Sequence, residues 1–135
     1  MPDVTTLYRQ LSPSSPELSS EVAQTTWEAL LADPKIHVSV AERGEILGTV
    51  TLVVVPNLMQ GARPYGLIEN VVTREDVRGQ GIGTALMTYV MEMARTLNVY
   101  KVMLVTGRQA PEVHRLYLKS GLKSDAVAYR ARFDL

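Results

Sequence analysis

The feature that most constrains the fold is a glycine-rich segment followed at once by a long amphipathic stripe. Gly79, Gly81 and Gly83 alternate with other residues where the stripe begins. Over residues 82–97 the apolar side chains fall at i, i+3, i+4, i+7, i+8, i+11, i+12 and i+15. This spacing gives one continuous apolar face on a helix, because a turn takes about 3.6 residues. The sequence therefore predicts a helix over 82–97, ended by Asn98 in a left-handed conformation.

Shorter patterns on both sides of this helix predict a mixed sheet. β-Branched runs flank a turn at Arg43-Gly44 and indicate a hairpin. Strands are expected over residues 5–11, 36–42, 46–55, 67–73, 99–105 and 126–133. Further helices are expected over 15–33, with Ser15 as N-cap and Pro16 in the first turn, and over 111–120, ended by Gly121. This order predicts one α/β domain spanning residues 1–135, with a six- to seven-stranded mixed sheet and helices on both faces.

Composition excludes several classes of protein. The chain has no cysteine, which removes disulfide frameworks, thiolate metal sites and a cysteine nucleophile. Fourteen basic and fourteen acidic residues cancel, so no broad field attracts nucleic acid or an anionic membrane. The longest apolar run, near Val50–Val55, is far shorter than the ~20 residues of a membrane span, and no secretory signal is seen. No His, Asp and Glu cluster has metal-ligand spacing. We therefore expect a cytoplasmic protein without a metal, nucleic-acid or membrane partner.

The glycine-rich segment is expected to bind a phosphate group. The first turn of a helix carries unpaired N–H donors and the positive end of the helix dipole. Arg78 adds a positive charge and Thr84 a hydroxyl at the same place. A Walker loop would need a lysine before Thr84, and a Rossmann fingerprint would need Gly-x-Gly-x-x-Gly, so neither fits. What remains is the pattern Arg-x-x-Gly-x-Gly, which Arg78, Gly81 and Gly83 satisfy.

The stretch Glu69 to Leu86 resembles the cofactor motif of the GNAT superfamily of N-acetyltransferases. Tyr100-Lys101-Val102 and then the segment Leu116 to Leu122 follow in the order found in that family. From Ile68 to Phe133 the pattern is similar to its glucosamine-6-phosphate N-acetyltransferase branch. The resemblance implies acetyl-CoA as the donor, a splayed sheet, and a backbone N–H near Val72 that faces the thioester oxygen. The donor-binding residues that it implies are Val71, Val72, Thr73, Arg78, Gly79, Gln80, Gly81, Ile82, Gly83 and Thr84.

Tyr117 is the candidate proton donor for acetyl transfer. The reaction needs an unprotonated amine and a leaving thiolate, so both a proton acceptor and a proton donor are required. The family motif implies Tyr117 as the donor, since a phenol with a pKa of about 10 matches a thiolate. Its spacing alone indicates packing, because Tyr117 shares an apolar helix face with Val113 and Leu116.

Glu69 is the candidate proton acceptor. It lies two residues before Val71 and, unless a bulge intervenes, shares its face of the strand. Three roles remain open for this carboxylate: it accepts the amine proton, it binds the ammonium group of the acceptor, or it pairs with an arginine.

The acceptor is expected to bind opposite the donor, beside the loop that precedes the 67–73 strand. Asn70 is a candidate acceptor ligand next to Glu69, and Arg63 in that loop could clamp a phosphate or carboxylate. The last strand is expected to reach this cleft, from the same chain or across a homodimer interface, through Tyr129, Arg130 and Arg132. These residues are explained equally well by a solvent-exposed loop and by an edge strand whose charged side chains prevent pairing with other chains.

The sequence thus predicts an N-acetyltransferase that moves an acetyl group from acetyl-CoA directly to a small primary amine, with an amino sugar phosphate as the nearest analogy. Without cysteine, the most familiar kind of acyl-enzyme cannot form. Two other functions stay open. One is an acyl-CoA-binding domain without turnover, since Gly121-Leu122 stands where the family usually has Gly-Phe. The other is an acetyltransferase of protein N-termini or lysines.

Overall fold

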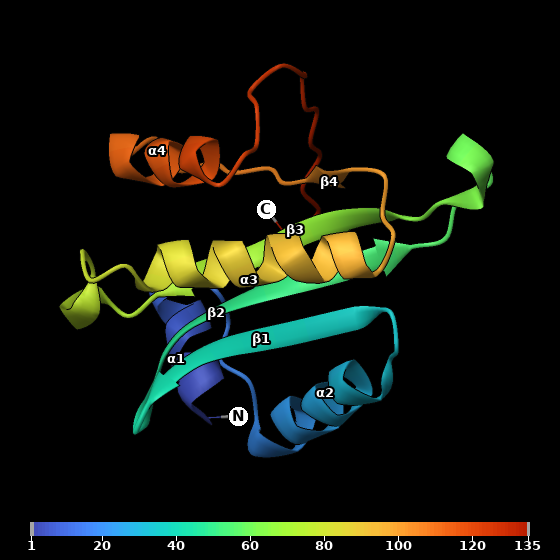
Figure 1. The fold of residues 1–135 in the computed structure, drawn as a ribbon. Coiled ribbons are helices and arrows are strands. Elements are labelled where there is room, and N and C mark those ends of the chain that lie inside the picture. Colours follow the sequence, from blue (N-terminus) through green and yellow to red (C-terminus); the bar gives the residue numbers. More distant parts are fainter. Residues whose placement is uncertain (1, 135) are drawn as a thin grey trace.

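The computed structural model describes residues 2–134 and contains one four-stranded sheet (Figure 1). Its strands, in spatial order, are β1 (Ile36–Arg43), β2 (Glu45–Val55), β3 (Tyr65–Thr73) and β4 (Val102–Met103). The first three are antiparallel to their neighbours, whereas β4 runs parallel to β3. The predicted hairpin is confirmed, because β1 and β2 meet at a turn in which Gly44 has a φ of 73°. The sheet is mixed, as the order of elements predicted.

Helix α3 (Ile82–Thr96) covers one face of the sheet and confirms the helix predicted from the apolar stripe (Figure 1). Asn98 ends it with a φ of 62°, as expected. The buried cluster between helix and sheet consists of Val50, Leu52, Ile68, Leu86, Met87, Val90 and Ala94. Each large side chain that is removed from water in this way stabilises the fold by about 1.5–3 kcal/mol relative to an exposed one. This packing places the N-terminus of α3 at the end of β3.

Residues 5–11 form part of a helix, so the strand predicted there is wrong. Helix α1 (Pro2–Leu11) contacts β2 and β3, and Figure 1 shows it behind the sheet, with α3 in front. Val4 and Leu7 are each only 2% exposed and stand three residues apart, which is helical spacing. Burial of this face outweighs the local β preference of Thr5 and Thr6.

Helix α2 (Ser20–Ala32) begins later than predicted and packs less tightly on the sheet than α1 does. Its N-cap is Ser19, whose Oγ accepts a hydrogen bond from the Val22 N–H at 3.2 Å, so the prediction of Ser15 as N-cap is wrong. The helix contacts β1, but none of its residues is buried. The side chains of Leu18, Val22 and Leu31, in and just before this helix, are largely exposed to solvent.

The sheet has four strands and not the expected six to seven. The strand expected over 99–105 pairs only at Val102–Met103, and residues 126–133 form no strand. The side chains of Val127, Tyr129 and Phe133 are therefore exposed despite their alternating pattern. An alternating segment becomes a strand only beside an edge with which it can exchange main-chain hydrogen bonds, and β4 offers a very short one.

The remaining elements agree with the sequence. Helix α4 (Pro111–Lys119) has proline at its first position, and Gly121 follows it with a φ of 98°. Two short 3₁₀ turns, η1 (Gln60–Ala62) and η2 (Glu75–Val77), interrupt the loops before and after β3. With α1 on one side of the sheet and α3 on the other, the predicted mixed α/β fold class is confirmed.

Gly48 on β2 tests how closely α3 packs on the sheet. A Cβ at this position would lie 2.9 Å from Leu86 Cδ1 and 3.0 Å from the carbonyl oxygen of Val72. We therefore expect Gly48→Ala to lower the free energy of unfolding, measured in urea, by about 1–3 kcal/mol. Gly107→Ala is the matched control, because its Cβ would meet nothing closer than 3.7 Å, and it should change the same quantity by less than about 0.5 kcal/mol. Equal losses in both variants would contradict this packing.

Candidate functional site

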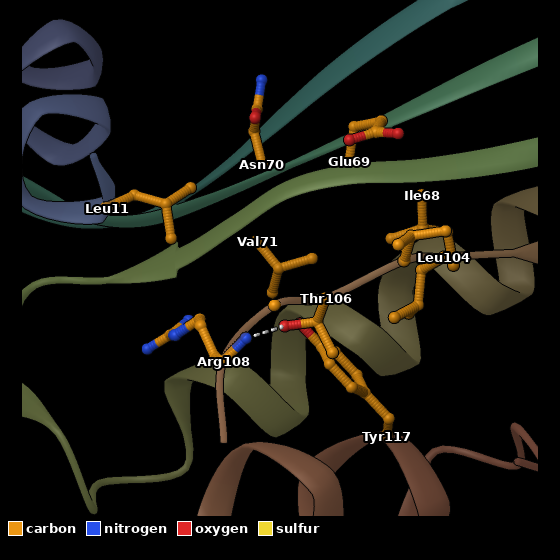
Figure 2. Close-up of a pocket in the computed structure, with 11 residues that line it drawn as sticks. Leu11, Ile68, Glu69, Asn70, Val71, Leu104, Thr106, Arg108 and Tyr117 are labelled. Carbon is orange, nitrogen blue, oxygen red and sulfur yellow. Dashed lines mark hydrogen bonds between the residues drawn. The ribbon is translucent and has the colours of Figure 1, made fainter. Parts of the chain in front are cut away.

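The candidate site lies where β3 separates from the chain that follows β4. Within the described residues the two strands pair only at Gly66–Val102 and Leu67–Met103. Beyond these pairs residues 104–108 diverge from β3 and leave a cleft of about 170 Å³. Figure 2 shows side chains from four parts of the fold around it. Those that matter for the chemistry are Leu11 of α1, Glu69, Asn70 and Val71 of β3, Arg108 after β4 and Tyr117 of α4.

A β-bulge at Asn70 decides which side chains of β3 face which side of the cleft. Thr49 and Thr51 of β2 are two residues apart, but their partners Val72 and Glu69 are three apart. Asn70 takes up the extra residue with a φ of 52°, a left-handed conformation that asparagine adopts more readily than most residues. As a result Glu69 and Val71 project to opposite sides of β3 (Figure 2). The shared face expected from simple alternation is therefore absent, because the bulge intervenes.

Tyr117 projects from α4 into the cleft, opposite Val71 (Figure 2). It is partly buried and packs against the core cluster, beside the half-buried Leu116. Burial raises the pKa of its phenol above the ordinary value of about 10, and the positive charge of Arg108 opposes this shift. The packing role and the chemical role that the sequence left open are thus compatible, because Tyr117 packs against the core and also lines the cleft.

Glu69 and Asn70 are exposed and project toward the side of the cleft on which α1 lies (Figure 2). Within residues 2–134 neither side chain forms a hydrogen bond or ion pair, so both are available to a ligand. The guanidinium of Arg108 likewise pairs with no carboxylate of the described chain. Leu11 and Arg108 were not predicted as site residues from the sequence. Arg108 could have been found, because ligands gather beyond the carboxyl ends of parallel strands.

The glycine loop between β3 and α3 presents an open row of main-chain donors. Gly79 and Gly81 have φ values of 79° and 82°, which favour glycine, and no atom lies within 4 Å of where their Cβ atoms would be. The first hydrogen bond within α3 runs from the Ala85 N–H to the Gly81 carbonyl. The N–H groups of Ile82, Gly83 and Thr84 therefore lack partners in the helix, and they lie at the positive end of its dipole. Such a helix end suits a phosphate group.

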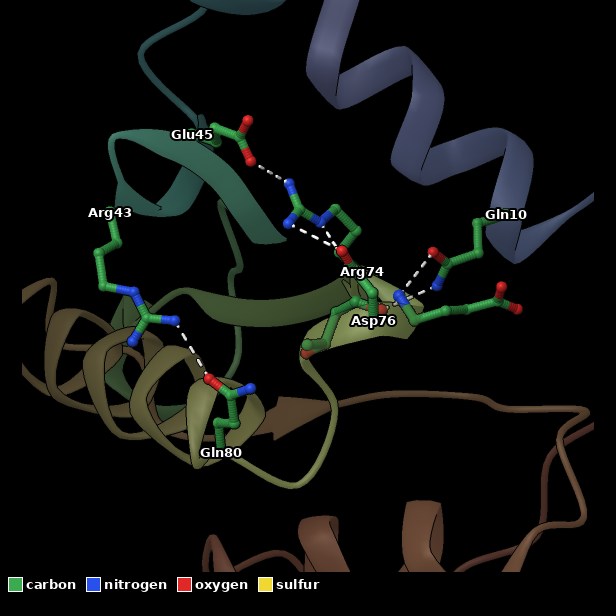
Figure 3. Close-up of polar contacts among 8 residues, drawn as sticks. Gln10, Arg43, Glu45, Arg74, Asp76 and Gln80 are labelled. Carbon is green, nitrogen blue, oxygen red and sulfur yellow. Dashed lines mark hydrogen bonds and ion pairs between the residues drawn. The ribbon is translucent and has the colours of Figure 1, made fainter.

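Arg74 connects the start of this loop to β2 and to the 3₁₀ turn η2 (Figure 3). Its guanidinium lies 2.6 Å from a carboxylate oxygen of Glu45 and contacts both oxygens of Asp76, at 2.6 and 3.0 Å. These contacts hold the pKa of the Asp76 carboxyl below its usual value and raise the pKa of Arg74. Because the groups are exposed to solvent, we interpret them as fixing the geometry of the loop more than the stability of the fold.

Two further side chains hold the loop from outside (Figure 3). Arg43, at the end of β1, donates a hydrogen bond of 3.1 Å to the side-chain oxygen of Gln80. Gln10, in the last turn of α1, donates to the Thr73 carbonyl at 2.8 Å and accepts from the Glu75 N–H at 3.0 Å. The loop is thus tied to α1, β1 and β2.

Arg63 is not among the residues that line the cleft. Its Nε donates to the carbonyl oxygen of Asn98 at 3.2 Å, and its Nη2 donates to that of Val99 at 3.0 Å. The η1 loop lies at the other end of the sheet from the glycine loop (Figure 1). In this structure Arg63 ties that loop to the chain between α3 and β4.

The C-terminal residues expected at the cleft divide into three cases. Arg130 comes close, since its Nη1 lies 3.7 Å from the position of a Cβ on Gly107, a residue of the cleft wall. Tyr129 is 93% exposed, and Arg132 pairs with Asp134. Arg130 and Arg108 therefore bring positive charge to the same edge of the cleft.

Within residues 2–134, no group of three or more His, Asp or Glu side chains could hold a metal ion. No helix in that part of the chain has the length and apolar character needed to cross a membrane.

Comparisons with known proteins agree on one family. A model of the acetyltransferase (GNAT) family matches residues 2–122. The chain is 32% identical over 108 residues to an aminoalkylphosphonate N-acetyltransferase of Salmonella typhimurium, covering 79% of this chain and 70% of that protein. It is 39% identical over 67 residues to a glucosamine 6-phosphate N-acetyltransferase of Trypanosoma brucei brucei, covering 50% and 46%. The structure of a putative acetyltransferase from Agrobacterium tumefaciens superposes with a TM-score of 0.91 at 42% identity, covering 97% and 92%.

The raised pKa of Tyr117 predicts a dependence of stability on pH. Because the phenol is harder to ionise in the folded than in the unfolded chain, its favourable contribution is complete below the unfolded pKa of about 10 and is lost as pH rises through the folded pKa. The free energy of unfolding of the wild type, minus that of Tyr117→Phe, should therefore fall between about pH 8 and about pH 11. Tyr89→Phe, at an exposed position of α3, gives the baseline for losing a tyrosine hydroxyl. A difference that stays constant over this range would contradict the assigned burial.

Proposed function

The chain belongs to the acetyltransferase (GNAT) family, and on that premise we propose that it transfers the acetyl group of acetyl-CoA to the primary amine of a small molecule. One observation carries the proposal: an open glycine loop at the N-terminus of α3 lies at the end of the strand whose separation from β4 forms the cleft. A donor with a diphosphate at one end and a thioester at the other suits this arrangement, because the helix end can bind phosphate and the cleft can admit a narrow chain.

The main chain of β3 is the proposed contact surface for the pantetheine arm. On the edge that faces residues 104–108, no strand of the described chain pairs with β3 beyond Leu67. Backbone groups that lack a strand partner need hydrogen bonds from a ligand or from water. The side chains of Val71 and Val72 pack against the fold, the second of them fully buried. These two residues can therefore serve the core with their side chains and the donor with their backbone.

Tyr117 and Glu69 suit the two proton transfers that the reaction requires. A proton donor must be protonated at working pH, and the raised pKa of Tyr117 keeps its phenol in that form. The bulge at Asn70 turns Glu69 toward the other side of β3, the side of α1. In the proposed arrangement the thioester carbonyl lies between them. Glu69 accepts the proton that the amine loses when its nitrogen bonds to the carbonyl carbon, the C–S bond breaks, and Tyr117 protonates the departing thiolate.

Positive charge at the edge of the cleft favours an acceptor that carries an anion. Arg108 lines the cleft and Arg130 lies beside Gly107, and neither pairs with a carboxylate of the described chain. The names of the two relatives above describe acceptors that combine an amine with a phosphonate or a phosphate. We extend that class, small primary amines with a phosphonate or phosphate group, to this chain. In this assignment Arg108 takes the anion-binding role that the sequence analysis gave to Arg63.

Donor binding and turnover can be tested separately. Acetyl-CoA should raise the melting temperature in proportion to the logarithm of its concentration. Release of the CoA thiol should then be followed with 2-aminoethylphosphonate, glucosamine 6-phosphate, glucosamine and a peptide amine, and the two anionic amines should give the highest kcat/KM. No binding at millimolar acetyl-CoA would contradict the proposal. Binding without thiol release would indicate an acyl-CoA-binding domain, and release with the peptide alone would indicate a protein acetyltransferase.

Replacing the proposed proton donor should affect turnover and not donor binding. Tyr117→Phe keeps the ring that packs against the core and removes only the hydroxyl, so kcat should fall by about 100-fold or more while the dissociation constant of acetyl-CoA changes by less than about twofold. The two quantities come from thiol release and calorimetry with the best amine of the panel. Tyr89→Phe is the matched control and should leave both unchanged. Full kcat in Tyr117→Phe would show that another group protonates the thiolate.

A further inference from the structure

Gln10 joins α1 to the point where β3 ends and the glycine loop begins (Figure 3). Its Nε2 donates to the carbonyl of Thr73 at 2.8 Å, and its Oε1 accepts from the N–H of Glu75 at 3.0 Å. One planar carboxamide thus engages the backbone on both sides of Arg74. Among side chains, only an amide offers a donor and an acceptor in this fixed geometry, and glutamine has the longer reach of the two amides.

The helix that carries Gln10 is firmly placed. Val4 and Leu7 bury α1 against the sheet, whereas Gln10 lies in the last turn and is only partly buried. A side chain on a packed helix can hold a neighbouring loop in place, because the helix itself does not follow the loop. Gln10 therefore ties the start of the loop to the core.

Besides Gln10, the start of the loop is held by the Arg74 N–H, which donates to the Leu47 carbonyl at 2.8 Å, and by side-chain contacts of Arg74 and Arg43. Arg74 pairs with Glu45 and Asp76 at the surface, and Arg43 bonds to Gln80 at the surface. Ion pairs of this kind are weak and are screened by salt. The amide of Gln10 acts instead on backbone groups, at the residue that begins η2 and at the last residue of β3.

We propose that Gln10 is a positioning residue for the donor. It holds the segment after β3 in the conformation that receives the diphosphate of acetyl-CoA, and it sets donor affinity without touching the reacting atoms. This inference rests on the function proposed above. Its neighbour Leu11 lines the cleft itself, so the end of α1 contacts both the donor loop and the site of reaction.

The test compares acetyl-CoA with S-acetyl-pantetheine, a donor that cannot contact the diphosphate loop. In Gln10→Ala and Gln10→Glu the dissociation constant of CoA, measured by calorimetry, should rise about tenfold, and kcat/KM for acetyl-CoA should fall by the same factor through KM. The glutamate variant keeps the acceptor for the Glu75 N–H but sets an oxygen against the Thr73 carbonyl. S-Acetyl-pantetheine has the thioester but lacks the diphosphate together with the 3′-phosphoadenosine, so its kcat/KM should change by less than about twofold.

Gln24→Ala is the matched control, since Gln24 is an exposed glutamine on α2 that bonds only to Glu28 among the described residues. It should leave both donors unaffected. An equal loss of kcat/KM with the two donors would overturn the inference, because the defect would then lie outside the diphosphate loop. An unchanged dissociation constant for CoA would also overturn it. If Gln10→Ala unfolds below the assay temperature, the result with Gln10→Glu decides whether the inference holds. If both variants unfold there, Gln10 stabilises the whole fold, and a role confined to the loop is overturned. A wild type that binds no CoA would overturn the proposed function as well.

Discussion

The structure depends on the burial of one apolar helix face against two strands. Helix α3 packs on Val50 and Leu52 of β2 and on Ile68 of β3, and this contact forms the central cluster. Because only a short loop separates β3 from α3, the same contact brings the unpaired N–H groups of the helix to the end of β3. The position of the glycine loop therefore follows from core packing, and its open backbone follows from the left-handed Gly79 and Gly81.

The chemistry of the site depends on where the sheet stops being regular. β3 loses its parallel partner beyond Leu67, which opens the cleft, and the bulge at Asn70 turns Glu69 away from Val71. A strand without these two irregularities would be paired on both edges and would project Glu69 and Val71 to the same side. The proposed proton acceptor and proton donor lie on opposite sides of β3 because of them.

Patterns within single elements could be predicted from the sequence, whereas contacts between distant segments could not. The α3 stripe, the hairpin around Gly44 and the ends at Asn98 and Gly121 depend on local spacing and on turn residues, and all are confirmed. The strand predicted over 5–11 is wrong because burial of α1 decides that segment, and residues 126–133 form no strand because no long edge lies beside them. The contacts of Arg63, and the bulge at Asn70, depend on partners far along the chain, so no local sequence pattern predicts them.

The central claim is that the donor binds along β3 and the glycine loop, and amide NMR during a titration with CoA tests it most directly. If the donor binds there, the largest shifts occur at residues 71–73 and 79–84, with almost none in α2. Shifts concentrated in α2 or in the loop of residues 56–64, with the glycine loop unaffected, would contradict it.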